Sequence, residues 1–528
     1  MLQSGCHEPG TDEQTDPALL KALRAPATYG GSCPVIAHET HASWVFIAGE
    51  YAYKIKKPVA LGFLDYGTLS RRHAACREEV RVNEELAPGI YLGVLAIVKE
   101  GDVFGFAAEG SPHAVEYAVQ MRSFSESDTM EASIAAGSLT AAEVERVGGC
   151  LACFHQSAPI VQSAEPEDVL ESWLVNVREM CALQYADRWP TDLAFHFGEA
   201  FVQANHLEIE RRARQGHVRD GHGDLRCEHV LLKPEIRVVD RIEFDPALRR
   251  IDVTADLAFL TMDLEAHGQT WAAQELVRAY TNAGGEVGSQ ALLSFYAAQR
   301  ALVRAKVTLL EAAEHQPADR GNRYERAEAL WALSERLCWR ARRPVAIVVC
   351  GPPASGKSTL AAELAQRCAL PVASSDVVRK GLAGLALTER ARPEHYSPEF
   401  TEVTYLHLAG QALGHLRAEG GVIVDATCRS PEQRKILLDE LDVAGVTWLV
   451  VYCHLDAKVA LDRAERRMGD PERASDATPE IVAQQVSRFE PPLELPAQSV
   501  LSLDTELSLE AQVWEVTYAL DERLLQRS

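Results

Sequence analysis

The sequence predicts an α+β region followed by an α/β domain with a parallel sheet. Its 528 residues exceed what one hydrophobic core usually serves, so we expect about three globular units. Short β-prone runs with a single helix come first, and a long helical stretch follows. After Pro344, continuous apolar strands alternate with helices, which is typical of a parallel sheet covered on both faces.

Composition and charge exclude several classes of function. Hydrophobic residues make up 47% of the chain and charged residues 24%, which predicts folded cores and not extended disorder. The net charge of -23 argues against bulk binding to nucleic acid or to an anionic membrane, because such surfaces are rich in Lys and Arg. No apolar run approaches the roughly 20 residues of a membrane helix. Met1–Pro17 lacks the features of a signal peptide, and the 12 cysteines are scattered, so we expect reduced thiols in the cytoplasm.

The N-terminal elements indicate a small sheet with one helix. Residues 1–30 are rich in Gly, Pro, Asp and Gln, which predicts a loose tail. Ser43–Ala48 and Tyr51–Lys57 are β-prone runs around Gly49-Glu50 and predict a hairpin. Leu69–Leu86 has helical spacing and ends before a Pro-Gly pair. Two further strands are predicted over Tyr91–Val98 and His113–Met121.

The middle of the chain is predicted to be mostly helical, from Leu139 to about Arg340. The exception is Gly221–Asp245, where short β-prone pieces surround a polar loop. The basic run Arg340–Arg343 and the following Pro344 mark a boundary. We therefore predict domains over residues 31–342 and 343–528, after the tail.

The last domain opens with an apolar strand, Val345–Cys350, and a helix over Ser358–Arg367. Further strands are predicted over Val422–Asp425, Trp448–His454 and Ser499–Leu503.

Between that first strand and helix lies the motif G-x-x-x-x-G-K-[ST], over Gly351–Ser358. Its glycines allow backbone amides to turn inward around phosphate oxygens, and the helix N-terminus adds positive potential. Lys357 would neutralise the β- and γ-phosphates, and the Ser358 hydroxyl would hold Mg²⁺, so we expect ATP and Mg²⁺ as cofactors. The alternative is a glycine-rich turn without a ligand. The expected nucleotide-binding residues are Gly351, Pro352, Pro353, Ala354, Ser355, Gly356, Lys357, Ser358 and Thr359.

Five further residues of this domain are candidates, and they are Asp425, Asp376, Arg379, Arg463 and Arg467. Asp425 ends an apolar strand, where a metal-binding acid is needed, although a cap or turn Asp would look the same. Asp376 and Arg379 form a D-x-x-R that could accept a hydroxyl proton and fix an acceptor, or be a helix cap with its partner. Arg463 belongs to a cluster with Arg466 and Arg467, before the polar segment Gly469–Thr478. Such a cluster could be a lid over the phosphates or a solvated helix face.

This domain resembles the P-loop kinases of the gluconate-kinase, zeta-toxin and polynucleotide-kinase-like group. The resemblance covers residues 343–520 through GPPASGKST, SSDVVRKGL, GVIVDATCR and the arginine-rich helix followed by SDATPE. It implies that Asp376 and Arg379 contact the acceptor and that Arg463 and Arg467 contact the nucleotide.

A second constellation runs from His222-Gly-Asp224 to His229. An Asp on a tight loop after Gly, with a polar metal ligand five residues later, is the arrangement of phosphotransferase catalytic loops. Asp224 would accept the proton of the acceptor. The following segment Ile242–Asp245 offers carboxylates for a metal site.

The region from Thr40 to Ala305 resembles the aminoglycoside-phosphotransferase-like, protein-kinase-like fold. The resemblance implies that Lys54 contacts the α- and β-phosphates, that Glu79 is its helix partner, and that residues 116–124 form the hinge. It implies that Asp224 is the base and that His229 stands where a metal-binding Asn is usual. Glu243 is the best match to the metal-binding acid, with Asp240 as the alternative. Asp256-Leu-Ala matches the Asp-Leu-Ala that usually follows.

The pairing of the two domains resembles a bacterial bifunctional phosphotransferase/ATP-binding fusion. We therefore expect an ATP-dependent kinase that transfers a phosphoryl group to a hydroxyl on a small molecule or a nucleic-acid end. The substitution by His229, the choice of Glu243 and the lack of a glycine-rich loop leave the catalytic competence of the N-terminal domain open. The alternatives are a P-loop NTPase that uses water, and one regulated by an N-terminal pseudokinase that binds a ligand.

Overall fold

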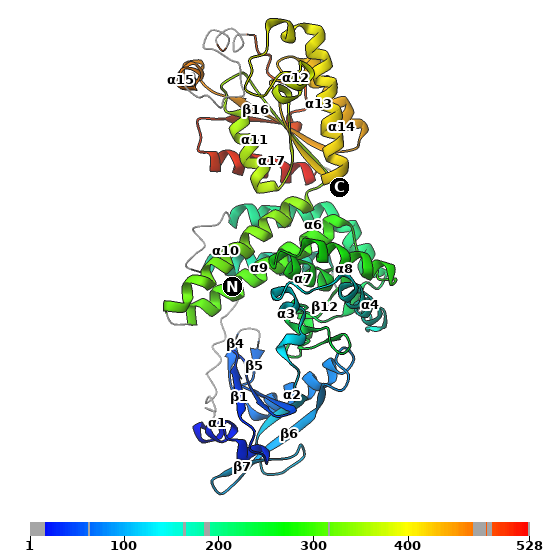
Figure 1. The fold of residues 1–528 in the computed structure, drawn as a ribbon, viewed down its shortest axis with the longest axis vertical. Helices are drawn as coiled ribbons and strands as arrows, with labels where there is room; N and C mark the ends of the chain where they lie inside the picture. The colour runs from blue at the N-terminus through cyan, green and yellow to red at the C-terminus, as the bar shows by residue number, and fades with distance from the viewer. Residues whose placement is uncertain are drawn as a thin grey trace, which may run out of the picture. The chain divides into compact units, whose positions relative to one another are not determined.

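The computed structural model describes residues 16–61, 64–161, 165–183, 191–314, 317–467, 482 and 488–525. The chain divides into two compact units, and Figure 1 labels many of their helices and strands. One consists of Met1–Ala164 and Glu210–Gly288, and the other of Glu165–Ile209 and Ser289–Ser528. The predicted domain boundary at 342/343 lies inside the second unit, so the helices before it share a unit with the parallel sheet.

The first unit begins with an antiparallel sheet in the order β1-β2-β3-β8-β6-β7. Its strands span β1 Val35–Glu39, β2 Ser43–Ala48, β3 Tyr51–Lys56, β6 Tyr91–Glu100, β7 Val103–Ala108 and β8 Ala114–Arg122. The predicted strands correspond to β2, β3, β6 and β8. The additional strands β1 and β7 are the two edges, where Phe104 of β7 is the one buried side chain, so there is little alternation of buried and exposed residues to detect.

Two helices, α1 and α2, pack against this sheet. Helix α2 (Leu69–Asn83) starts at Thr68, whose hydroxyl accepts a hydrogen bond from the Arg71 amide, and packs against β8 and β6. Helix α1 (Pro17–Leu23) lies within the stretch that the sequence predicts as a tail. Its Leu19 and Leu23 are buried in a core cluster with aromatic residues of β2 and β3.

Two short two-stranded sheets carry the polar loop of this unit. Strand β9 (Val218–Asp220) pairs with β12 (Arg250–Asp252), and β10 (Val230–Leu231) pairs with β11 (Arg237–Val238). The turn η4 (Cys227–His229) lies between β9 and β10. The surrounding helices are α3 Met130–Ala135, α4 Ala141–Ser157, α7 Val253–Ala266 and α8 Thr270–Asn282. Helix α7 is buried from Val253 to Leu264, so it is the central helix of this region.

The second unit starts with long helices. They are α5 Pro166–Ala182, α6 Thr191–Arg214, α9 Gln290–Glu314 and α10 Pro317–Ala341, and α9 packs along α10. Helix α6 crosses the division between the units. Buried aromatic rings hold α6 and α9 together, since Phe201 and Phe295 stack with their centroids 4.4 Å apart.

The parallel sheet has the strand order β14-β15-β13-β16-β17. Its strands are β13 Val345–Cys350, β14 Val372–Ser374, β15 Gly421–Asp425, β16 Thr447–His454 and β17 Val500–Asp504. Its helices are α11 Lys357–Cys368, α12 Ser375–Leu382, α13 Pro398–Glu419, α14 Pro431–Val443, α15 Ala457–Arg467 and α17 Leu509–Leu525. Alternate residues of β13 enter different core clusters, so helices cover both faces of the sheet, as the apolar strands predict.

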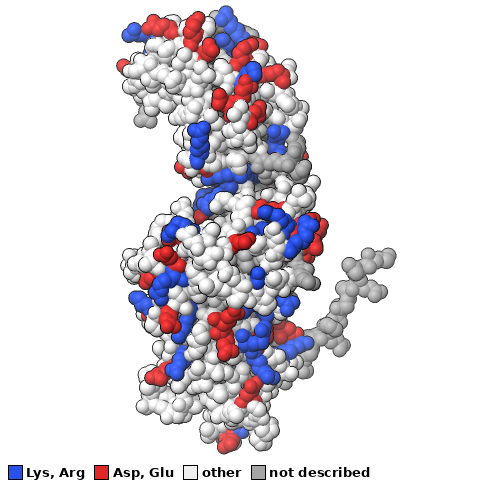
Figure 2. Space-filling model, turned by 90° about the vertical axis from the view of Figure 1, so that its right-hand side faces the viewer, with Lys and Arg blue, Asp and Glu red and all other residues white. Residues whose placement is uncertain are grey.

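The described part of the surface carries side chains of both charges. Figure 2 shows Lys and Arg interspersed with Asp and Glu over the described part of one face. Among the residues that the structure describes, no helix combines the length and the apolar character needed to cross a membrane.

Candidate functional site

The loop between β13 and α11 has the backbone of a phosphate-binding nest. Gly351, Ala354 and Gly356 all have positive φ angles, of 145°, 64° and 89°. Gly356 is the N-cap of α11, so the loop leads directly into the helix N-terminus. A Cβ at Gly351 would lie 2.3 Å from the carbonyl oxygen of Cys453, so only glycine fits there. Such a turn presents backbone N–H groups to an anion.

The side chains of the loop also suit a phosphate ligand. The Ser355 hydroxyl is fully buried and has no hydrogen-bond partner among the residues that the structure describes. The Lys357 ammonium group donates to the Pro352 carbonyl oxygen at 2.9 Å, so it lies over the loop and not away from it. Ser358 and Thr359 are exposed in the first turn of α11. A buried hydroxyl without a partner is rare in folded proteins, and a phosphate oxygen would satisfy it.

The carboxyl edge of the sheet gathers the predicted acids. In the register, Asp425 at the end of β15 lies opposite Val349 of β13 and opposite Ser374 of β14. Asp376 follows in the first turn of α12. Asp425 and Asp376 therefore lie at the strand ends that flank the nest, which is where ligands bind in parallel α/β folds.

Arg379 is held inside the domain. It is only 6% exposed, and its Nη1 donates to the carbonyl oxygen of His395 at 2.6 Å. The guanidinium also lies over the ring of Tyr396, at 4.8 Å. Its Nε is buried without a hydrogen-bond partner. Arg379 thus fixes the segment after α12, and its predicted contact with an acceptor stays a prediction.

Of the three clustered arginines Arg463, Arg466 and Arg467, only Arg463 has a described side chain. Its Nη2 donates to the backbone oxygen of Thr505 at 2.8 Å. A methyl group built on Gly356 would lie 3.5 Å from Nη1 of Arg463, so this guanidinium lies beside the nest. The side chains of Arg466 and Arg467, and the segment Gly469–Thr478, lie outside what the structure describes.

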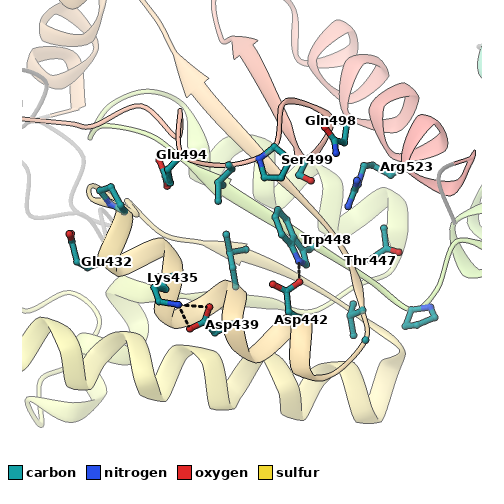
Figure 3. Close-up of a pocket in the computed structure, with 17 residues that line it drawn as sticks. Glu432, Lys435, Asp439, Asp442, Thr447, Trp448, Glu494, Gln498, Ser499 and Arg523 are labelled. Atoms are coloured by element: carbon teal, nitrogen blue, oxygen red, sulfur yellow. Dashed lines mark hydrogen bonds and ion pairs between the residues drawn. The ribbon is translucent and has the colours of Figure 1, made fainter.

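A pocket of about 1040 Å³ lies at the opposite end of the same sheet (Figure 3). It is lined by the start of β16, by α14 and by the segment before β17. Trp448 and Asp442 meet there through a 2.7 Å hydrogen bond. No predicted site residue lines it, because the strand ends that form it are the amino ends. Size alone therefore does not make it the nucleotide site.

The first unit brings Lys54 and Glu79 together as the resemblance implies. The Lys54 ammonium group of β3 is 2.9 Å from the Glu79 carboxylate of α2 and 2.5 Å from Asp240. Burial alone would lower the pKa of Lys54, but Asp240 and Glu79 raise it well above its ordinary value. Lys54 is therefore a fixed cation in the interior of this unit.

Sequence reasoning missed the second lysine of β3. Lys56 is 1% exposed, lies 2.5 Å from Glu79 and pairs with Glu243. Tyr66 also donates to Glu243, at 2.7 Å. The alternation Lys54-Ile-Lys56 was the available signal, because residues two apart point to one face of a strand. Glu243 is thus occupied as a buried counterion.

The geometry therefore favours Asp240 over Glu243 as the metal-binding acid. The Asp240 side chain is 44% exposed, faces Lys54, and lies 3.8 Å from Nε2 of His229. Its backbone has a positive φ of 63°, an unusual conformation for a residue other than glycine. Its partly enclosed position opposes ionisation, yet the Lys54 ammonium group holds the pKa of Asp240 well below its usual range.

Asp256 anchors the polar loop from the inside. Its carboxylate accepts from the amides of His222 at 2.6 Å and Gly223 at 2.9 Å, and lies 3.0 Å from Nε2 of His155. Burial by itself raises the pKa of Asp256, but the hydrogen bond to His155 and these amides lower it below the ordinary value. The Asp-Leu-Ala match thus marks a residue that positions the loop.

Asp224 is engaged by its neighbour Arg226. The Arg226 guanidinium donates to both carboxylate oxygens of Asp224, at 3.0 and 3.1 Å. Nδ1 of His229 donates to the backbone oxygen of Asp224 at 2.8 Å, which leaves Nε2 directed toward Asp240 and Arg226. Sequence reasoning did not anticipate the Arg226 contact. A base in this position works only when its arginine partner releases it.

Comparison with known proteins agrees with the C-terminal geometry. A family model described as an AAA domain matches residues 347–492, from within β13 to the segment before β17. Uncharacterized proteins of Mycobacterium tuberculosis and Mycobacterium bovis are 29% identical to this chain over 463 residues. The match covers 85% of this chain and 89% of each of those proteins.

Solved structures resemble one part of the chain at a time. A gluconokinase from Sinorhizobium meliloti covers 34% of this chain and 93% of its own, with 20% identity and a TM-score of 0.26. A choline/ethanolamine kinase family protein from Mesorhizobium loti covers 61% of this chain and 97% of its own, with 17% identity and a TM-score of 0.34. By its own nest and strand order, the C-terminal part of this chain has the architecture of a P-loop domain, and the AAA domain model matches within it.

Proposed function

We propose that this protein is an ATP-dependent phosphotransferase whose P-loop domain transfers the γ-phosphoryl group of ATP to a hydroxyl acceptor. The nest over Gly351–Ser358 carries the proposal, because its buried Ser355 hydroxyl and its lysine suit a triphosphate. Bound Mg²⁺ would neutralise charge on the phosphates.

Each residue of the carboxyl edge has a role that follows from its position. The amides of the nest and Lys357 bind the phosphates, and the Ser358 hydroxyl and Asp425 are the groups that would hold the metal ion. Asp376 receives the proton of the acceptor hydroxyl, since it opens α12 next to the strand that pairs with Asp425. The Arg463 guanidinium adds positive charge beside Gly356.

The Lys357→Ala variant of the full chain tests the nest. We expect ATP affinity or transfer at this site to fall by at least about 100-fold, as when a group that stabilises developing charge is removed. Lys435→Ala is the matched control, because Lys435 belongs to the same domain but is exposed and paired with Asp439. Equal nucleotide binding and turnover in both variants would refute the proposal.

The Asp376→Asn variant separates a kinase from an NTPase that uses water. Transfer to an acceptor should fall by about 100-fold or more when the base is lost. Hydrolysis of ATP without acceptor should persist, because the nest and the metal-binding groups are intact. A radiolabelled-ATP screen of metabolites and polynucleotide ends identifies the acceptor. An Asp224→Asn background restricts that screen to the P-loop domain.

A second candidate function concerns the N-terminal region, as a module that binds a nucleotide and regulates the P-loop domain. The engagement of Asp224 by Arg226, with His229 in place of a metal-binding Asn, favours binding over transfer. In a Lys357→Ala background, the remaining ATP binding should disappear when Lys54→Ala is added. Transfer in that background that depends on Asp224 would instead make the region a second kinase.

A further inference from the structure

Three potential metal ligands converge beside the polar loop of the first unit, and a fourth lies next to one of them. Donor atoms of Cys227, Asp263 and His267 all lie within 4.8 Å of one another. Cys227 belongs to η4, and Asp263 and His267 belong to the end of α7 and its C-cap. Oε1 of Glu131, on α3, is 3.4 Å from Nε2 of His267. Three separate elements therefore supply the cluster.

The protonation of His267 follows from its contacts. Nδ1 lies 2.8 Å from the backbone oxygen of Asp263, and a carbonyl oxygen only accepts, so Nδ1 carries a proton. Nε2 then points at the Glu131 carboxylate. Either a proton on Nε2 or a bound cation must therefore lie between the imidazole and the carboxylate. A metal-bound histidine typically donates its other N–H to a carbonyl or carboxylate in this way.

We propose that Cys227, Asp263, His267 and Glu131 bind one divalent cation of the Zn²⁺ class. A thiolate, an imidazole and two carboxylates suit zinc, whereas Mg²⁺ and Ca²⁺ prefer oxygen ligands alone. Tetrahedral zinc places its ligand atoms about 3.5 Å apart, so the cluster contracts slightly on binding. The Cys227 thiol loses its proton to solvent when the Zn–S bond forms.

The ion would fasten the polar loop to α7. Cys227 lies three residues after Asp224, and its amide already donates to Asp263 at 2.8 Å. Cys227 is fully buried and Asp263 is 8% exposed, while His267 and Glu131 are partly exposed, so the cluster has a solvent side for entry. This inference does not depend on the proposed kinase activity.

Co²⁺ is the probe of choice, because a thiolate ligand gives it a charge-transfer absorption band. Full-length protein is stripped with a chelator and titrated with Co²⁺ and with Zn²⁺, and bound metal is counted by elemental analysis. We expect one tight site whose thiolate band disappears in Cys227→Ser. The band should persist in Cys76→Ser, since Cys76 is an equally buried cysteine of the same unit.

If Cys227→Ser fails to fold, variants of the two partly exposed ligands still test the proposal. His267→Gln and Glu131→Gln should each weaken Zn²⁺ binding by more than about 10-fold, the lower limit for loss of even an indirect partner. Zn²⁺ should also raise the unfolding temperature of the native protein and not that of His267→Gln. The proposal is overturned if the stripped protein binds no metal tightly, or if these variants bind it as the native chain does. In that case His267 and Glu131 form an ordinary ion pair.

Discussion

At the scale of single residues, the nest depends on positions where only one side chain fits. Gly351 approaches the Cys453 carbonyl so closely that a methyl group cannot enter. Ser355 is buried with its hydroxyl unsatisfied, which has a cost in the absence of a ligand. The strain and the unmet hydrogen bond are the local features from which ligand binding would gain.

The Gly351→Ala variant should disrupt the nest. The added methyl lies 2.3 Å from a backbone oxygen, so we expect a loss of about 1–3 kcal/mol in the free energy of unfolding, together with loss of nucleotide binding. Gly410→Ala on α13 is the control, since a Cβ there meets no atom within 4 Å. Urea unfolding of the two variants measures the difference in their stability. If Gly351→Ala is as stable as the control, the close approach does not exist in solution.

The buried His222 makes stability depend on pH. Its Nε2 donates to the Val239 carbonyl at 2.9 Å, and Nδ1 accepts from the Asp224 amide. Burial lowers the pKa of His222 to about 4. The unfolded chain, with an ordinary pKa of about 6.5, binds this proton more readily, so stability falls as pH drops from about 6.5 to 4, by about 3 kcal/mol.

His222→Gln tests this dependence, because the amide can still donate to Val239 but does not titrate. Unfolding by urea at several pH values should show a flatter profile than that of the native chain between pH 6.5 and 4. The remaining slope reports other groups, such as Asp256, whose lowered pKa also costs stability at acid pH. An unchanged slope would mean that His222 is not buried as a neutral group.

At the scale of elements, the turn that follows α10 is tied to α17 of the parallel-sheet domain by a buried ion pair. Arg342 donates to the Asp521 carboxylate of α17 at 2.7 and 2.8 Å. Arg342 is 3% exposed and Asp521 is fully buried. His196 of α6 stacks on Tyr518 of α17 at 4.0 Å, so a second helix is attached in the same place.

Breaking the pair on one side should be costly. Arg342→Met leaves a buried carboxylate without its partner, and we expect about 3–5 kcal/mol of destabilisation. Adding Asp521→Leu should restore much of it, because neither charge is then buried. Lys435→Met, at an exposed i,i+4 pair, should cost less than about 0.5 kcal/mol. Chemical unfolding of the native chain, Arg342→Met, Asp521→Leu and the double variant measures the coupling, and additive single effects would contradict it.

At the scale of the whole molecule, the unit that contains the P-loop domain begins well before residue 343. Trp339 of α10 is 2% exposed within the core cluster on one face of the parallel sheet. A chain that starts at residue 343 lacks this side chain and also Arg342. The helices therefore belong to the folding unit of the nucleotide site, and not to a detachable linker.

A fragment of residues 343–528 should accordingly be less stable than one of residues 289–528. The shorter fragment exposes the surface that Trp339 covers and leaves Asp521 unpaired, which together cost several kcal/mol, about 3 or more. Thermal unfolding should show a lower midpoint for the shorter fragment. Asp521→Leu should raise the midpoint of the shorter fragment alone. Equal midpoints for the two fragments would mean that the sheet is independent of α10.

The sequence by itself determined the elements that rest on local pattern. The apolar strand Val345–Cys350, the nest and the helix after it follow from residues that are neighbours in the chain, and so does the tight loop at Asp224. Tertiary structure decided which charges meet. The partners of Lys54 and Lys56, the Arg226 contact and the preference for Asp240 over Glu243 depend on groups brought together by folding. The periodicity of a sequence indicates which face of a helix or strand is buried, but it does not indicate which charged side chain of another element will face it.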